Sequence, residues 1–338
     1  MRVVTTQQMR SLVFLVQAGI LCTAISTSLL RSADRSSVYW VWSGAVTTDS
    51  AVVKARVHPG TNTARLLVDT TSSFRNPVSF PSSGYVEPDP DGVATFRLTG
   101  LAADTAYHYS IEVDGQRRLS GKLHTFAQGP MSFRVAFGSC ATTGSNHEIF
   151  STIEGMNPLF FLHMGDFHYE DIAKNDPALF RDAFEKVLAS QRQSSLYRSS
   201  PIVYIWDDHD YGPNDSDRLA KGKPAAMKVY RQYVPHYPLS QPTNQLGTIQ
   251  QAFTVGRVRF ILTDGRSERD PTSDPDGLEK SMLGVEQQGW LFKELASAKD
   301  YALVVWVNVV PWITRNQPGS DVGWEPFSYE RRLIADEI

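Results

Sequence analysis

The hydrophobic pattern of this chain changes near Gln128-Gly129-Pro130, and the two patterns suit different folds. Before this point, from about Val38 onward, short segments rich in Val, Tyr, Phe and Thr alternate apolar and polar residues between turn-forming sequences. Short strands at this spacing are typical of a small β-sandwich. These segments show no cluster of catalytic residue types, so we expect residues 36–127 to form a β-sandwich domain with a structural or docking role.

After the change, apolar strands alternate with helical segments. This alternation is typical of an α/β layered domain, which we place at residues 132–338. We expect FRVAFGSC, at 133–140, to be a buried strand. The other expected strands are 158–166, 201–208, 258–264 and 302–310. The expected helices are 147–155, 176–190, 225–234, 285–298 and 328–338.

The N-terminal segment has a separate character. Residues 11–30 carry no charged side chain and follow Arg2 and Arg10. A positive start before an apolar run predicts a secretory signal peptide over residues 1–35. The run is also about long enough to span a bilayer, so an uncleaved membrane anchor is the alternative. Either interpretation places the rest of the chain outside the cytosol, secreted or membrane-anchored.

The overall charge of the chain argues against nucleic acid as a partner. The formal net charge is −3, which leaves no basic footprint of the kind that nucleic-acid binding requires. We therefore expect no nucleic-acid-binding surface, and we expect a monomer.

Four of the expected strands end in polar residues. These ends are Ser139-Cys140, Gly165-Asp166, the run at 207–210, and Asp264. Ligands of open α/β sheets bind outside the carboxyl ends of the strands. Carboxylates directly after a buried run would be costly to desolvate unless a cation offsets their charge. The pattern therefore predicts a cation at this edge.

The residue types at these strand ends suit two kinds of metal. Cys140 offers a thiolate and Tyr169 a phenolate, which suit a redox metal such as iron. The carboxylates of Asp166 and Asp208 and the amide of Asn214 suit calcium, magnesium or manganese. Two such metals could clamp a phosphate ester and activate a water for in-line attack.

Each of these elements also has a simpler structural interpretation. A free cysteine such as Cys140 is often a small buried residue. The acidic run at 207–210 could be a solvated loop or a capped helix start. His163 and His168, which flank Asp166, would more often be packed groups or supports for a ligand. Asp264-Gly265-Arg266 is either a plain turn, or a metal-side Asp with an Arg that forks onto phosphate.

Three short motifs occur in a fixed order along the second part of the chain. They are Gly138-Ser139-Cys140, Gly165-Asp166-Phe167-His168-Tyr169 and Trp206-Asp207-Asp208-His209-Asp210-Tyr211-Gly212. Together they resemble the alkaline phosphatase D (PhoD-like) family of metallophosphatases. The segment at 282–287 and the Trp-Ser-Gly at 42–44 are similar to further parts of that family. The resemblance covers nearly everything from about Val38 to the end.

The resemblance implies an immunoglobulin-like sandwich followed by a calcineurin-like, layered αββα metallophosphatase domain. It implies Fe³⁺ and Ca²⁺, or another divalent metal, as cofactors. Cys140 and Tyr169 would bind the iron, and Asp166 would bridge the two metals. Asp208 and Asn214 would lie on the other side.

The resemblance also implies catalytic roles. His209 would stabilise the transition state or protonate the leaving group, and Asp207 would bind a metal or support a ligand. Arg266 would complete the catalytic set as the phosphate-binding cation suggested by its strand end. The implied reaction is hydrolysis of phosphomonoesters and phosphodiesters, with small-molecule or lipid phosphate esters as substrates.

The sequence departs from the family pattern toward its C-terminal end. Family members continue to a later strand with a Ser-Gly-Asp-x-His type motif, which supplies further metal ligands, and none follows Asp264 here. We therefore expect the metallophosphatase-like domain to be incomplete at this end. One alternative to an enzyme is a non-catalytic secreted or surface remnant that has lost these ligands. A weaker alternative is an esterase with Cys140 as nucleophile, for which the sequence assigns no His and carboxylate pair.

Overall fold

The computed structural model describes residues 37–77, 85–86, 88–239, 247–313 and 323–338. The signal peptide or anchor predicted over residues 1–35 lies outside these residues. Within the described part of the chain, no helix combines the length and the apolar character needed to cross a membrane.

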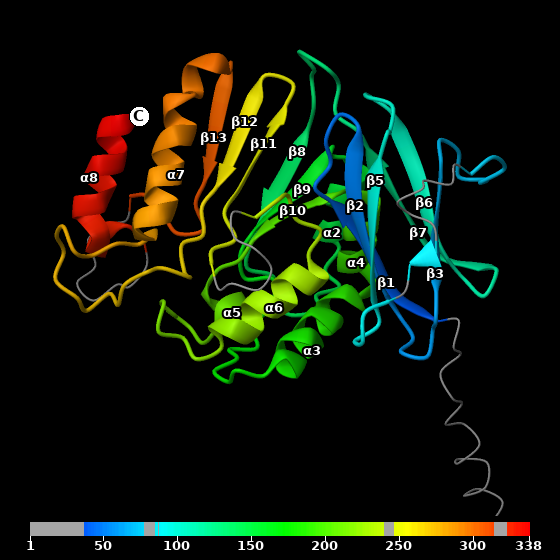
Figure 1. Ribbon diagram of the computed structural model, residues 1–338, viewed down its shortest axis with the longest axis horizontal. Coiled ribbons are helices and arrows are strands. Elements are labelled where there is room, and N and C mark those ends of the chain that lie inside the picture. The colour runs from blue at the N-terminus through cyan, green and yellow to red at the C-terminus, as the bar shows by residue number, and fades with distance from the viewer. Residues whose placement is uncertain (1–36, 78–84, 87, 240–246, 314–322) are drawn as a thin grey trace, which may run out of the picture.

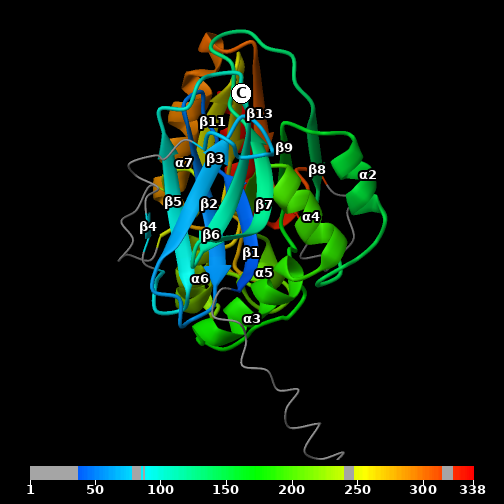
Figure 2. The same cartoon turned by 90° about the vertical axis from the view of Figure 1, so that its right-hand side faces the viewer.

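The first strands of the chain form two antiparallel layers (Figure 2). One layer contains β1 (Val38–Gly44), β2 (Ser50–Val57) and β5 (Val93–Thr99). The other contains β3 (Ala64–Asp69), β4 (Tyr85–Val86), β6 (Ala106–Val113) and β7 (Gln116–His124). Both layers contribute side chains to one hydrophobic core, among them Phe96 and Tyr109. The immunoglobulin-like topology implied by the resemblance stays a prediction.

The second part of the chain builds two more groups of strands. β8 (Val135–Gly138), β9 (Phe160–Met164) and β10 (Ile202–Ile205) pair in parallel and extend the β5-β2-β1 layer into a six-stranded sheet. The link between β1 and β10 is a single pair, Gly44 with Ile202. The second sheet contains β11 (Gln251–Val255), β12 (Val258–Leu262) and β13 (Leu303–Val307).

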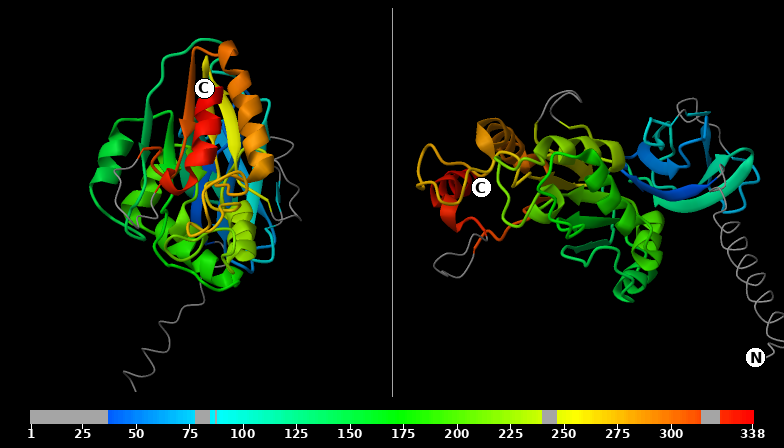
Figure 3. Two further views of the ribbon diagram at one scale, coloured as in Figure 1. Left: turned by 90° about the vertical axis from the view of Figure 1, so that its left-hand side faces the viewer. Right: turned by 90° about the horizontal axis from the view of Figure 1, so that it is seen from below.

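Helices flank these sheets (Figure 1). The helices between β8 and β11 along the chain are α2 (Ile149–Gly155), α3 (Pro177–Leu188), α4 (Gln191–Ser199), α5 (Asp208–Tyr211) and α6 (Lys223–Tyr233). The later helical elements are α7 (Gly284–Ala296), α8 (Ser328–Glu337) and the short turns η2 (Ala298–Asp300) and η3 (Glu325–Phe327). A second core joins α7 and α8 to β12 through Leu291, Ile334 and Ile261. Seen from below, the N-terminal strands and α8 lie at opposite ends of the molecule (Figure 3).

Three features differ from the pattern in the sequence. The sequence predicts a buried strand at 133–140, but β8 lies at the edge of its sheet and Phe137 is 68% exposed. The exposure of Phe137 follows from the position of β8 in the strand order, which the hydrophobic pattern of the sequence does not reveal. Helix α4 and strand β11 are not predicted by the sequence pattern. The sequence of α4 is polar, and it forms a helix because Leu196 and Tyr197 are buried against the core.

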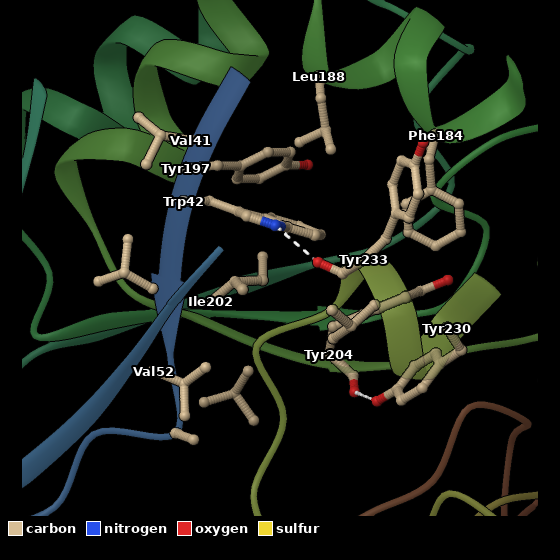
Figure 4. Packing of buried hydrophobic residues seen from close by; sticks show 14 of the residues in the cluster. Val41, Trp42, Val52, Phe184, Leu188, Tyr197, Ile202, Tyr204, Tyr230 and Tyr233 are labelled. Atoms are coloured by element: carbon tan, nitrogen blue, oxygen red, sulfur yellow. Dashed lines mark hydrogen bonds between the residues drawn. The ribbon is translucent and has the colours of Figure 1, made fainter. Parts of the chain in front are cut away.

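An aromatic core connects the N-terminal strands to the strand end that carries Asp166. Two of its residues, Trp42 and Tyr197, are drawn in Figure 4. The ring of Trp42, on β1, lies 5.7 Å from that of Phe167 and 6.1 Å from that of Tyr197. Phe167 is fully buried and follows Asp166 directly. This packing supports the loop after β9, so its backbone position depends on β1.

The C-terminal end of α6 is also held by the N-terminal strands. The last four carbonyl groups of a helix have no partner within the helix. Here Trp42 Nε1 donates to Tyr233 O at 2.9 Å (Figure 4), and Lys54 Nζ donates to Gln232 O at 2.8 Å and to Arg231 O at 2.5 Å. The fourth carbonyl accepts the backbone N–H of the cap residue. Side chains of β1 and β2 therefore complete this helix.

We expect Lys54→Met to lower the free energy of unfolding by about 2 kcal/mol, because two poorly solvated carbonyl groups lose their donor. Urea unfolding followed by circular dichroism measures the change. Lys122→Met is the matched control, since Lys122 Nζ makes an exposed hydrogen bond to Asn157. We expect a change within about 0.5 kcal/mol for that variant. Equal effects of the two substitutions would contradict the role given to Lys54.

The effect of Lys54→Met should also depend on pH. Burial, with a contribution from Arg97, lowers the pKa of Lys54 from 10.5 to about 7. Between these values the unfolded chain holds a proton on Lys54 that the folded chain lacks, so the stability of the wild type rises with pH. The variant lacks this gain. The difference in unfolding free energy should therefore be larger at pH 9 than at pH 7.

Candidate metal centre

The residues that follow β8, β9 and β10 meet at one edge of the six-stranded sheet. The chain turns sharply there: φ is 62° at Cys140, 85° at Gly165 and 55° at Asp166. The Cys140 N–H donates to Gly165 O at 3.3 Å and ties the first two turns together. Non-glycine residues in this left-handed region are unusual and gather at functional sites. The turns bring the side chains of separate strands against one another.

Asp166 lies at the centre of these side chains. Its Oδ2 accepts hydrogen bonds from Tyr169 Oη at 2.8 Å and from Cys140 Sγ at 3.3 Å. Its Oδ1 is buried and has no hydrogen-bond partner among the described residues. A buried carboxylate oxygen without a partner is costly, and a bound cation would remove that cost. The donor set around Asp166 therefore fits a metal ion.

A second group of potential ligands starts at the same carboxylate. One ligand atom each from Asp166, Asp208 and His209 lies within 4.8 Å of the others. Asp208 and His209 belong to the short helix α5, in which Asp207 is the N-cap and forms a capping box with Asp210. The run at 207–210 is thus a capped helix start. Two of its residues, Asp208 and His209, also belong to the cluster.

The surroundings of Cys140 and Tyr169 favour the protonated forms of both side chains. Burial raises the pKa of the Cys140 thiol, and the charge of Asp166 raises it further. Burial likewise raises the pKa of Tyr169, as do its contacts with Cys140 and Asp166. Cys140 is exposed, so its interpretation as a small buried residue is wrong. Both groups can become anionic ligands when a metal replaces their protons.

His209 is oriented by a residue that the sequence motifs do not identify. Its Nδ1 lies 2.6 Å from Asp171 Oδ1, and its ring lies 4.4 Å from that of Tyr169. Burial lowers the pKa of His209, but the bond to Asp171 and the neighbouring carboxylates outweigh it and raise this pKa above its usual value. Two acidic residues directly after Tyr169 are the one sign of Asp171 in the sequence. Its contact depends on a turn with φ of 48° that the sequence does not reveal.

Arg266 contacts carboxylates instead of lying open to a substrate. Only 4% of it is exposed. Its Nε lies 2.5 Å from Asp207 Oδ1, its Nη2 lies 3.5 Å from Asp208 Oδ1, and its Nη1 donates to Ser216 O at 3.3 Å. Burial raises the pKa of Asp207 to about 6, although Arg266 opposes that shift. The guanidinium group of Arg266, which the sequence predicts to bind phosphate, therefore binds carboxylate and carbonyl groups of the protein.

Asn214 belongs to a loop beside the cluster. The neighbouring residue, Asp215, donates its backbone N–H to Asp208 Oδ2 at 2.6 Å, which places this loop beside the cluster. Asn214 itself is exposed and its side-chain amide donates to Asp215 Oδ2 at 2.5 Å. Its role as a ligand stays a prediction.

Two aspartates at the predicted edge are turned away from the cluster. Asp210 accepts the backbone N–H groups of Phe167, His168 and Asp207. Asp264 is fully buried, and its carboxylate accepts from Trp206, Ile249, Arg266 and Ser267. The metal-side interpretation of Asp264 is therefore wrong, because both oxygens of its carboxylate serve the fold.

The two histidines that flank Asp166 are packed groups. Burial lowers the pKa values of His163 and His168 to about 3. The ring of His163 lies 5.2 Å from that of Phe167, and the ring of His168 lies 5.9 Å from that of Phe184. Their interpretation as packed residues agrees with these contacts.

Comparison with known proteins identifies the family to which this chain is similar. A family model described as PhoD-like phosphatase matches residues 135–320. Alkaline phosphatase D of Bacillus subtilis is 25% identical over 242 residues, which is 59% of this chain and 41% of that protein. An uncharacterized protein of Mycobacterium tuberculosis is 27% identical over 234 residues, 63% of this chain and 41% of that protein. The chain thus spans about two fifths of the length of the curated relatives it matches.

Solved structures show the shared fold. The structure of PhoD covers 90% of this chain and 69% of its own, with a TM-score of 0.78 and 18% identity. A purple acid phosphatase from yellow lupin covers 80% of this chain and 50% of its own, with a TM-score of 0.52 and 13% identity. The predicted metallophosphatase fold is thereby confirmed. Because the family model matches more than half of the chain, in the part that carries the candidate metal centre, this protein belongs to the PhoD-like phosphatase family.

Proposed function

We propose that this chain carries a metal-dependent phosphoric ester hydrolase site that cleaves phosphate monoesters and diesters. The observation that carries the proposal is the shared position of Asp166. One of its oxygens faces Cys140 and Tyr169, its other oxygen is buried without a partner among the described residues, and the same carboxylate lies in a cluster with Asp208 and His209. A carboxylate between two groups of ligands suits a bridge between two metals.

The two groups of ligands differ in chemistry, and this supports two different metals. Cys140 and Tyr169 offer soft and phenolate donors, which favour Fe³⁺. Asp208 offers a hard oxygen, as would Asn214 after a rotation of its side chain, and these favour Ca²⁺ or another divalent cation. A metal pair at this position supplies Lewis acidity and an activated water.

In this proposal, His209 donates a proton to the leaving group. Because Asp171 holds His209 through Nδ1, the Nε2 atom is the ring nitrogen left to donate to a departing or non-bridging phosphate oxygen. Asp207 is a positioning residue in this proposal, since its carboxylate is bound by Arg266. The substrate would be a small-molecule or lipid phosphate ester.

The direct test is to purify the full chain, measure its metal content by elemental analysis, and follow hydrolysis of a bis-aryl phosphate diester. Iron near one equivalent together with turnover supports the proposal. Folded protein without metal or turnover would instead favour the non-catalytic alternative. The secreted or membrane-anchored location, based on residues 1–35, belongs to the proposal and is tested by following whether the chain is exported and cleaved.

Cys140→Ser should lose iron preferentially while the divalent metal is retained, because a hydroxyl is a much poorer ligand than a thiolate for iron. We expect iron content to fall at least about tenfold, with a similar loss in kcat/KM. Ser151→Ala, at an exposed position of α2, is the control and should keep its iron. Unchanged iron content in the Cys140 variant would remove this residue from the ligand set.

A further inference from the structure

We propose that Arg266 acts as a built-in counter-charge that weakens cation binding on the Asp208 side of the cluster, so that the Cys140 side fills first. This inference rests on the proposed function and assigns a specific task to a residue that was expected to bind phosphate. Its basis is an asymmetry between the two sides of Asp166. A fixed guanidinium contacts Asp208 on one side, whereas the groups on the other side contact one another.

The position of Arg266 is fixed by the fold. Its backbone N–H donates to Asp264 Oδ1 at 3.0 Å, and Asp264 is itself fully buried. Its guanidinium reaches Asp207, Asp208 and Ser216 O through three different nitrogens. A side chain held at both ends cannot swing away when a cation arrives. Its charge therefore acts on the site in the metal-free and metal-bound states alike.

Both oxygens of Asp208 already have partners. Oδ1 lies 3.5 Å from Arg266 Nη2, and Oδ2 accepts the backbone N–H of Asp215 at 2.6 Å. A cation that binds Asp208 must share these oxygens and must approach a fixed positive charge at close range. Like charges at a few ångströms repel strongly in a partly buried site. Binding on this side is therefore weakened.

The Cys140 side has the opposite balance. Asp166 Oδ2 accepts from the protonated Cys140 and Tyr169, and neither of these two groups carries a positive charge. Among the described residues, the ion pairs of Arg266 are with Asp207 and Asp208 and not with Asp166. A cation there compensates a buried anion and gains two anionic ligands as their protons leave. This side should bind its metal more tightly.

The test is a titration of the metal-free full chain with Co²⁺ alone. A thiolate ligand gives Co²⁺ a near-ultraviolet absorption band, and this band reports occupancy on the Cys140 side, while calorimetry counts all bound metal. We expect the band to be complete after the first equivalent and a second equivalent to bind more weakly without adding to it. A band that develops only with the second equivalent, or two equivalents of equal affinity, would overturn the inference.

Two variants separate charge from positioning. Arg266→Gln should tighten the second binding step at least about tenfold, because the repelling charge is gone. Arg266→Lys keeps the charge and should leave the second step weak. If Arg266 serves only to position Asp208, both variants weaken that step, and the inference fails. The order of filling in the wild type remains decisive even if a variant does not fold.

Failure of the inference can be told from failure of the proposed function. Two equally tight cobalt ions with turnover of the aryl diester overturn the role of Arg266 and leave the hydrolase proposal standing. A folded chain that binds no cobalt overturns both.

Discussion

Replacement of Asp166 by Asn is expected to remove bound metal and to reduce kcat/KM for an aryl phosphate diester by at least about a thousandfold. The substitution keeps the shape of the side chain but removes the charge that both groups of ligands share. Electrostatic stabilisation by a metal contributes several kcal/mol to such reactions, and a thousandfold loss corresponds to about 4 kcal/mol. Elemental analysis and steady-state kinetics on the same preparation measure both effects.

The control for this variant is Asp182→Asn. Asp182 lies on the exposed side of α3, outside the metal cluster, and carries the same change of charge. It should keep its metal and its activity. Asp166→Asn protein that is folded and still binds metal at the wild-type level would show that the cluster is not the metal centre.

Gly165→Ala should strongly destabilise the fold, although it adds only one methyl group. A Cβ at this position would lie 2.3 Å from Asp207 Cβ and 2.8 Å from Asp207 N, and φ there is 85°. The backbone of Asp207 cannot yield without moving the start of α5. We expect a loss of about 3 kcal/mol or more in unfolding free energy, from strain and steric overlap together. Chemical unfolding measures the change.

The matched variant is Gly289→Ala, which adds the same methyl group within α7. An added Cβ there meets nothing within 4 Å. Because alanine favours helix over glycine, this variant should gain about 0.5–1 kcal/mol. Metal binding should fall only in the Gly165 variant, since that position lies between Asp166 and Asp207. Similar stability changes in the two variants would contradict the close approach at Gly165.

The sequence is informative where the fold follows from local pattern. Apolar runs of four to five residues mark β9 and β10, and parallel strands share the edge at which they end. Because of that geometry, the apolar runs predict that Cys140, Asp166 and Asp208 lie at the same edge of the sheet. The spacing of three between Asp207 and Asp210 likewise indicates a capped helix start.

The sequence fails where the partner of a side chain decides its role. Asp208 and Asp264 both follow apolar strands, but only packing directs one toward the cluster and the other toward Trp206 and backbone N–H groups. The sequence suggests that Arg266 is available to bind phosphate, but in the structure its guanidinium contacts Asp207 and Asp208. Asp171 joins His209 across 38 residues of chain, a contact that no local period encodes.

Because Trp42 and Lys54 donate hydrogen bonds to the last carbonyl groups of α6, the N-terminal strands are not independent of the second part of the chain. A fusion that grafts another β-domain in front of residue 132 would leave the carbonyls of Arg231, Gln232 and Tyr233 without their donors. The opposite cut would remove both carbonyl acceptors of Lys54, because they belong to α6. The N-terminal strands therefore cannot be exchanged freely, and shuffling of this architecture should succeed only when a donor sheet brings a tryptophan and a lysine to the same two positions.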